Sequence, residues 1–237
     1  MKKLLALSLV ALTATAATAG TAFLQYSIWS PGDLMLPWER SDVYGIRLDM
    51  PYGNNKGIVN GVDLGFVAYT ESQVAGVEAT FLNVAELANV YGLQIGLLAN
   101  RAKTAYGVQF GGIVNWDSDA VYGLQTGLVN FDGELYGVQL GGVNWLVGNA
   151  SGVSIGGFIL ANNVFSGLSV AALNYGLQGM TGAQLGVVNL ALDTSNGLQL
   201  GLINAAKNHE GLQLGLINLN ETGFMPCFPL FNFNFKR

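Results

Sequence analysis

The chain has very few of the side chains on which catalysis and cross-linking depend. Its 237 residues include one histidine, His209, and one cysteine, Cys227. One cysteine excludes an intramolecular disulfide, and a Ser-His-Asp or Cys-His arrangement would have to use that single imidazole. We expect His209 to lie in a turn and Cys227, between Pro226 and Pro229, to pack in the C-terminal tail. The sequence therefore predicts a protein that is not an enzyme.

Charge is equally scarce. Only 11% of the residues are charged, and no Lys or Arg occurs between Lys103 and Lys207. The acidic residues of that stretch are Asp117, Asp119, Asp132, Glu134 and Asp193. Because a sparse, acidic charge leaves no basic surface for phosphates, the sequence predicts no nucleic-acid partner.

Signals for cofactors are missing as well. The sequence has no GxxxxGK[ST] segment, which a phosphate-binding loop requires. Asn115, Asp117 and Asp119 resemble a fragment of a calcium loop, but the glycine and the final glutamate of an EF-hand loop are absent. We interpret these acids as solvated turn residues, and we predict no catalytic residue, no cofactor-binding residue and no metal site.

The N-terminus has the features of a bacterial export signal. Lys2 and Lys3 precede an apolar run from Leu4 to Leu12, and a small-residue tract ends at Ala19. This pattern predicts a signal peptide at residues 1–19, cleaved before Gly20. Its removal leaves 8 Lys and Arg against 15 Asp and Glu, a balance of −7. We therefore expect an exported protein.

What the chain has in abundance is glycine, with 33 residues placed in a repeat. The motif is glycine-aliphatic-Gln-aliphatic-Gly-aliphatic-aliphatic-Asn, and the clearest copies are GLQLGLIN at Gly197–Asn204 and Gly211–Asn218. Twelve leading glycines recur at intervals of 14 to 16 residues: Gly45, Gly61, Gly76, Gly92, Gly107, Gly123, Gly137, Gly152, Gly167, Gly182, Gly197 and Gly211. A fixed short period predicts a repeat architecture.

Each copy alternates with the period of two that is typical of a strand. In the copy at Gly92, one face carries Tyr91, Leu93, Ile95 and Leu97, and the other carries glycines and Gln94. A helix is implausible because each of the two glycines in every eight residues would cost about 1 kcal/mol relative to alanine. The pattern does not say whether the aliphatic face points toward lipid or into a packed core.

Two all-β architectures fit this repeat. We expect a closed antiparallel β-barrel-like sheet of about twelve strands, because YGLQ and YGVQ copies alternate with the length of a hairpin between Gly92 and Trp145. Gly197–Asn204 would then run antiparallel to Gly211–Asn218. The alternative is a β-solenoid with one repeat per rung and with Gln and Asn stacked in ladders, which the uniform connections favour.

The predicted order is a signal peptide at 1–19, an N-terminal segment at 20–44, a repeat β-domain at 45–224 and a C-terminal aromatic strand at 225–237. In that last strand, Phe231, Phe233 and Phe235 alternate with asparagine. The alternation resembles the final strand by which outer-membrane proteins are recognised for assembly, although Lys236 and Arg237 follow the last aromatic residue. A strand that merely closes the sheet is the alternative.

The segments outside the repeats carry a family resemblance. They read QYSIWSP at 25–31, VYGIRL at 43–48, PYG at 51–53 and MPCFPLFNF at 225–233. With the GLQLGLxN repeats, they resemble the LA_2272-like surface repeat-containing proteins, a family of uncharacterised exported bacterial proteins. The resemblance implies a surface or outer-membrane location and implies no ligand.

These observations lead to two functional expectations. The first is a non-catalytic bacterial envelope protein with a structural or barrier role in the outer membrane or at the cell surface, whose partners are that membrane or its assembly machinery. The alternative is a soluble or surface-attached scaffold, periplasmic if it is not at the surface, that binds a ligand or partner through its turns or a strand face.

Overall fold

The regular structure of the described residues consists of β-strands. The structure is a computed structural model, and it describes residues 20–27, 35–36 and 41–235. The strands are β1 (Thr21–Ser27), β2 (Met35–Leu36), β3 (Asp42–Asn55), β4 (Ile58–Thr70), β5 (Gln73–Gly111), β6 (Val114–Leu146), β7 (Ala150–Ala161), β8 (Val164–Gly176), β9 (Gly179–Leu200), β10 (Ile203–Asn220) and β11 (Cys227–Asn234). The predicted all-β class is confirmed, and the predicted signal peptide at 1–19 lies outside the described residues. The described part contains no helix with the length and apolarity needed to cross a membrane.

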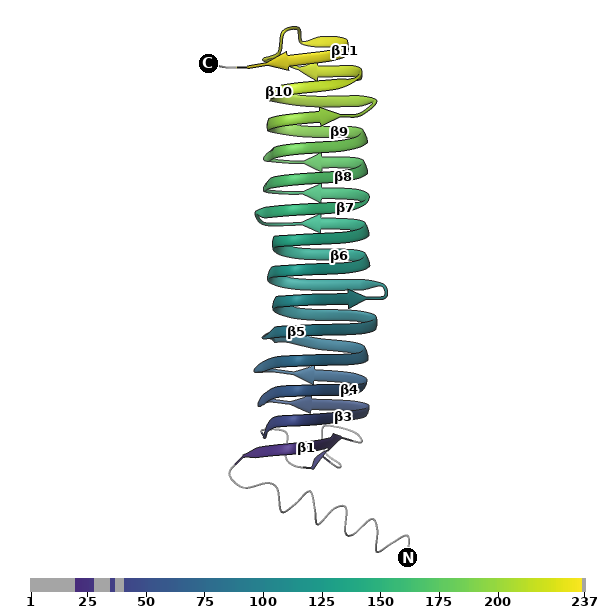
Figure 1. The fold of residues 1–237 in the computed structure, drawn as a ribbon, viewed down its shortest axis with the longest axis vertical. Helices are drawn as coiled ribbons and strands as arrows, with labels where there is room; N and C mark the ends of the chain where they lie inside the picture. Colours follow the sequence, from purple (N-terminus) through teal and green to yellow (C-terminus); the bar gives the residue numbers. More distant parts are fainter. Residues whose placement is uncertain (1–19, 28–34, 37–40, 236–237) are drawn as a thin grey trace, which may run out of the picture. The chain divides into compact units, whose positions relative to one another are not determined.

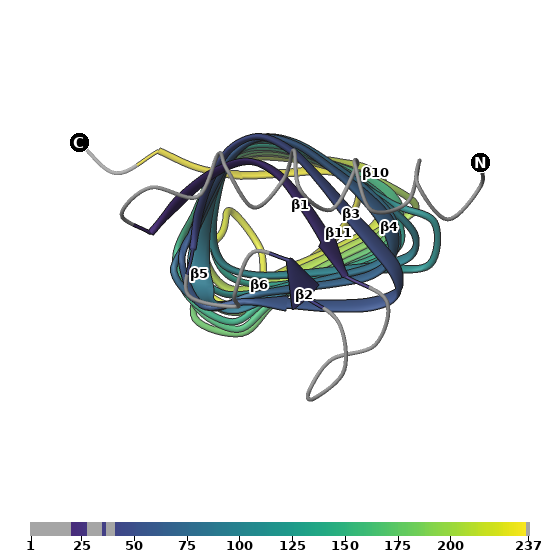
Figure 2. The ribbon, with the colours of Figure 1, turned by 90° about the horizontal axis from the view of Figure 1, so that it is seen from below.

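The contacts divide the chain into two units, Met1–Ser118 and Asp119–Arg237. Five of the leading glycines belong to the first unit and seven to the second. In the first unit, β3 pairs with β4 and β4 pairs with β5, both in parallel, with Gly45, Gly61 and Gly76 in register. The view from below shows β3 and β4 overlying each other (Figure 2).

The second unit repeats this arrangement over more rungs. Strands β7, β8, β9 and β10 follow one another as parallel neighbours (Figure 1). Gly152, Gly167 and Gly182 stand in register, and Gly197 stands opposite Gly211. Each unit is therefore a β-solenoid in which one repeat makes one rung.

The preferred expectation of a closed antiparallel barrel is thus wrong, and the alternative solenoid is confirmed. Gly197–Leu200 pairs in parallel with Gly211–Leu214, one rung away. The physical reason is that a motif copy is one full circuit of the coil and not half of a hairpin. The alternation of YGLQ and YGVQ copies therefore marks successive rungs.

The leading glycine of each motif has a backbone that other residues rarely adopt. All twelve have positive φ angles, between 113° and 158°. A Cβ atom at Gly152 would also fall on the carbonyl oxygen of Gly137 in the preceding rung. Glycine recurs there because both the local conformation and the close stacking exclude a side chain.

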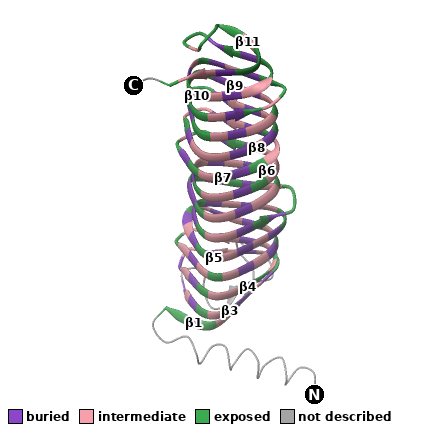
Figure 3. Ribbon diagram, turned by 45° about the horizontal axis from the view of Figure 1, so that its top comes forward, coloured by how far each residue is buried: buried purple, intermediate pink, exposed green. Residues whose placement is uncertain are grey.

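The alternation along each rung places amides inside and aliphatic side chains outside. Buried residues recur along β7 and β8 between exposed and half-buried ones (Figure 3). In β5, Gln94 is fully buried whereas Leu97, on the other face, is 69% exposed. The aliphatic face that the sequence left unassigned is the outer face.

Both ends of the chain add strands to these rungs. In the first unit, β1 pairs in parallel with β3, so part of the predicted N-terminal segment forms a further rung. In the second unit, β11 pairs antiparallel with β10, from Gly211 opposite Asn234 to Leu219 opposite Cys227. The predicted C-terminal aromatic strand is therefore a cap on the last rung. Lys236 and Arg237 lie outside the described residues.

Candidate functional site

The first candidate is the outer surface of the rungs, which is unusually apolar. Leucines stand out most, with Leu97 69% exposed, Leu216 61% and Leu128 59%. The same outer faces carry half-exposed aromatic rings, among them Phe158 and Trp145. Contiguous apolar surface of this kind marks a site that contacts lipid, a ligand or another protein.

Aromatic side chains on this surface stack from rung to rung. In the first unit, the ring centroids of Phe66 and Phe81 lie 4.8 Å apart, and those of Tyr91 and Tyr106 also lie 4.8 Å apart. In the second unit, Tyr122 stacks on Tyr136 at 4.9 Å. The stacking follows from the parallel register, because equivalent residues of neighbouring rungs are separated by the spacing of adjacent strands.

One stretch of each rung remains polar. In the second unit Asn149, Gln178 and Asp193 are exposed. Asn149 directly precedes β7, Gln178 directly precedes β9, and Asp193 directly precedes Thr194, which pairs with Asn208. Lys207 and Glu221 are exposed at the corresponding part of the later rungs. The rungs thus combine broad apolar faces with a narrow polar border.

The interior contains two ladders of buried amides beside buried apolar side chains such as Leu135, Ile159 and Phe165. Gln213 donates to Gln199 at 2.7 Å, and Gln199 donates to Gln184 at 2.5 Å. The asparagine ladder runs in the opposite direction along the chain: Asn174 donates to Asn189 at 2.8 Å, and Asn189 donates to Asn204 at 2.7 Å. The ladders that accompany the solenoid alternative are confirmed.

Backbone carbonyls complete the bonding of the asparagines. The second amide hydrogen of Asn189 goes to the carbonyl of Leu200 at 3.1 Å, so this amide donates twice and accepts once. The second motif glycine provides the space, because a Cβ at Gly141 would lie 2.5 Å from the side-chain oxygen of Asn144. A buried amide with its partners in place avoids a cost of about 1–3 kcal/mol per unsatisfied group.

Charged residues replace the glutamines of the ladder in the first rungs of the first unit. The Gln position is taken by Arg47 in β3, Asp63 in β4 and Glu78 in β5, which stand in register with one another. Asp49, two residues after Arg47, adds a third carboxyl. All four side chains are fully buried. The motif pattern did not predict this cluster, although the register places three of its members at the Gln position.

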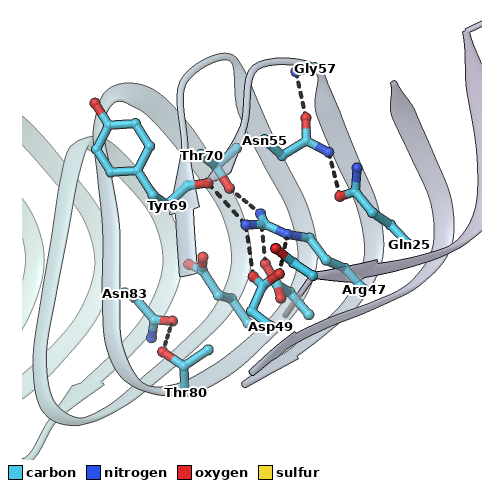
Figure 4. A network of polar contacts seen from close by, with 12 residues as sticks. Gln25, Arg47, Asp49, Asn55, Gly57, Tyr69, Thr70, Thr80 and Asn83 are labelled. Carbon is cyan, nitrogen blue, oxygen red and sulfur yellow. Dashed lines mark hydrogen bonds and ion pairs between the residues drawn. The ribbon is translucent and has the colours of Figure 1, made fainter. Parts of the chain in front are cut away.

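All three nitrogens of the Arg47 guanidinium form hydrogen bonds or ion pairs (Figure 4). Its Nε donates to Asp49 Oδ1 at 3.1 Å, and its Nη2 lies 2.7 Å from Asp49 Oδ2. Its Nη1 donates to the Thr70 hydroxyl at 2.7 Å and lies 3.1 Å from Asp63 Oδ2, while Nη2 donates to the carbonyl of Tyr69 at 3.0 Å. The Asp63 contact is an ion pair without hydrogen-bond geometry.

The three carboxyl groups of the cluster have fewer hydrogen-bond partners than Arg47. Glu78 Oε2 accepts from Gln94 at 2.7 Å, but Glu78 Oε1 and Asp63 Oδ1 have no hydrogen-bond partner. Burial raises the pKa of Asp49 to about 8 against the lowering effect of Arg47, and it raises the pKa of Glu78 to about 8 with a further contribution from Asp63. Burial also raises the pKa of Asp63. For Arg47, burial lowers the pKa, and the nearby carboxylates raise it by more.

The structure corrects the expectation for His209. It lies in β10 and not in a turn, because the polar segment at 205–210 pairs with β9. The imidazole is fully buried, neither ring nitrogen has a hydrogen-bond partner, and burial lowers its pKa. Cys227 is exposed at the start of β11, so the expectation that it packs is also wrong.

Two of the predicted turn acids are instead interior residues of β6. Asp117 and Asp132 are fully buried, where Asp117 accepts from Gln109 at 3.1 Å and Asp132 accepts from Gln125 at 2.8 Å. They were misread because the coil has strand where a barrel would have turns. Asp119, like Asp193, is exposed. Within residues 20–27, 35–36 and 41–235, no His, Cys, Asp and Glu side chains gather in a group able to hold a metal ion.

Comparison of the chain with protein-family models, with curated proteins and with solved structures gives no match. The resemblance to the LA_2272-like surface repeat-containing proteins therefore stays a prediction.

Proposed function

We propose that the protein is a non-catalytic scaffold of the bacterial envelope whose aliphatic outer faces lie against membrane lipid. The observation that carries the proposal is the distribution of side chains, with the motif glutamines and asparagines buried and many leucines exposed. Full burial of a leucine side chain is worth about 1.5–3 kcal/mol. A chain that exposes leucines in one rung after another is therefore most stable where its surroundings are themselves apolar.

The absence of charge in the sequence favours lipid over a protein partner. No Asp, Glu, Lys or Arg occurs between Glu134 and Asp193, a stretch that includes β7, β8 and much of β9. Protein interfaces usually have an apolar centre inside a polar rim. Rungs that carry no charge along their whole circuit fit the uncharged hydrocarbon region of a bilayer better.

A scaffold that binds a partner protein is the second candidate. The stacked rings of Tyr91 and Tyr106 favour it, because tyrosine is enriched at protein interfaces. On that alternative the outer faces would be covered by a protein and not by lipid. The predicted export signal and the predicted envelope location support both candidates equally.

Flotation with lipid vesicles tests the proposal. The purified chain is mixed with vesicles of uncharged phosphatidylcholine and floated through a density gradient. We expect the wild-type chain to float and Leu128→Asp to float at least about tenfold less, because a carboxylate on the apolar face costs more than 1.4 kcal/mol in hydrocarbon. Asn149→Asp adds the same charge at the polar border and should float like the wild type.

Three outcomes are informative. Loss of flotation in Leu128→Asp alone supports lipid contact through the outer face. Equal flotation of all three chains contradicts it. A wild-type chain that stays at the bottom of the gradient but binds a second protein through Tyr91 and Tyr106 establishes the alternative.

A further inference from the structure

The buried cluster at Arg47 has more negative than positive charge. With every group ionised, Asp49, Asp63 and Glu78 oppose one guanidinium, which leaves two uncompensated negative charges among fully buried side chains. Uncompensated charge in a protein interior is expensive, and a buried carboxyl avoids the cost by taking up a proton. Two protons make the cluster neutral.

The hydrogen bonding indicates where protons are needed. Asp63 Oδ1 and Glu78 Oε1 are buried and have no hydrogen-bond partner, although an ionised carboxylate requires donors on both oxygens. Asp49 Oδ2 and Asp63 Oδ2 are also buried without a hydrogen-bond partner, although each forms an ion pair with Arg47. The shortage of donors is thus local to these three side chains.

We propose that Asp49, Asp63 and Glu78 form an interior site that binds two protons while the first rungs are folded, and that release of these protons loosens β3, β4 and β5. Each proton forms an O–H bond to a carboxylate oxygen, with no change of oxidation state. The site is independent of the lipid-facing surface, since it lies inside the coil.

Among the residues that the structure describes, Arg47 is the cation that the structure pairs with these carboxyls. On β3 the neighbours are Arg47 and the phenol of Tyr52, and β4 contributes Tyr69 and Thr70, beside Glu71. On β5 the neighbour of Glu78 is the amide of Gln94. From β1 the inward residue is Gln25, which accepts from Asn55. Arg47 is the cation that acts on all three carboxyls.

The direction of the pH effect follows from the raised pKa values. A carboxyl whose folded pKa exceeds its unfolded pKa stabilises the fold below the unfolded value and loses that effect as the pH rises through the folded value. The window runs from the ordinary values of 3.8 for Asp and 4.5 for Glu to about 8 for Asp49 and Glu78. With two protons released on opening, the folding equilibrium falls by up to about a hundredfold per pH unit in that window.

Hydrogen exchange on the full chain tests the proposal. Peptides from β3 to β5 are followed from pH 5 to pH 9, corrected for the intrinsic pH dependence of exchange, with peptides from β9 as the reference. We expect opening of β3–β5 to increase with pH in the wild type. Glu78→Gln restores the glutamine found in later rungs and should reduce the increase to about tenfold per pH unit, since one titrating group is lost. Asp193→Asn removes an exposed acid and should change nothing.

A second measurement needs no variant. Infrared spectroscopy of the wild-type chain at pH 7 should show the carbonyl band of buried protonated carboxyls, and this band should disappear above pH 9. Two results would overturn the proposal: absence of the band at pH 7, or an opening of β3–β5 whose pH dependence is the same in the wild type and in Glu78→Gln. Presence of the band together with the weaker pH dependence of the variant supports it.

Discussion

The leading glycine and the two amides of each motif have separate structural tasks. The glycine permits positive φ and close stacking of carbonyls, Gln fills one side of the interior, and Asn fills the other. The recurrence of these three residues could be seen in the sequence, and it predicted strands. Their inward direction could not, because Gln94 and Leu97 alternate equally well whichever face is inside.

Substitution of a leading glycine should be costly. Gly152→Ala forces a φ of 138° on a residue with a Cβ and places that atom on the carbonyl oxygen of Gly137. We expect a loss of at least about 2 kcal/mol in the free energy of unfolding, from strain alone. Urea denaturation of the variant and the wild type measures it.

Gly157→Ala is the matched control in the same rung. Its backbone lies outside the positive-φ region, and a Cβ there would sit 3.0 Å from the carbonyl oxygen of Gly142. A small shift relieves that contact, so we expect a loss below about 1 kcal/mol. Equal losses in the two variants would show that the positive φ of Gly152 is not the reason for its glycine.

The cluster at Arg47 could not be predicted from the sequence without knowing how the motif copies pair. Arg47, Asp63 and Glu78 occupy the position of the motif Gln, but their chemistry differs from it and from one another. Counting from the leading glycines would have aligned the three. Their mutual contact could be inferred only once neighbouring copies were known to stack in parallel.

At the scale of the elements, one repeat is one rung of a parallel coil. The 15-residue period was read correctly, whereas its hairpin-length modulation was misread as antiparallel pairing. His209, which the sequence predicted in a turn, lies in a polar segment that continues β10. Polar residues occur in these strands for two reasons. Amides on the inward face bond to one another, and polar residues at the border of the outer face are exposed to water.

The cap formed by β11 has a testable role. It covers the edge of β10 with antiparallel pairs, and Phe233 stacks on Phe224 at 5.3 Å. Deletion of residues 225–237 should expose the backbone donors and acceptors of β10, and free strand edges associate with one another. We expect the truncated chain to form larger assemblies than the full chain. Light scattering after gel filtration measures the molar mass, with both chains purified in one detergent.

A control separates the backbone of the cap from its rings. Full-length chain with Phe231→Ser and Phe233→Ser keeps the strand over the β10 edge but loses two aromatic side chains. It should have the molar mass of the wild type. If the truncated chain also keeps that mass, β11 is not an edge cap.

At the scale of the whole molecule, both units bury the amides of the motif beside an apolar core and expose many large apolar side chains. Leu97 in the first unit and Leu128 in the second are among the most exposed leucines, whereas Gln94 and Gln125 are fully buried. The sequence predicted an apolar face in every copy and an envelope setting for it. It could not assign the face, because lipid outside and a core inside both reward the same alternation.

Cysteine scanning with an environment-sensitive fluorophore tests this arrangement most directly. In a Cys227→Ser background, Gln139→Cys is on the inner face, Leu140→Cys on the outer face and Asn149→Cys at the polar border. We predict that Gln139→Cys resists labelling until the chain is unfolded, and that the label at Leu140 shifts to the blue when phosphatidylcholine vesicles are added while the label at Asn149 does not. Rapid labelling of Gln139→Cys in the folded chain, or the same spectral response at Leu140 and Asn149, would contradict a polar interior with a lipid-facing exterior.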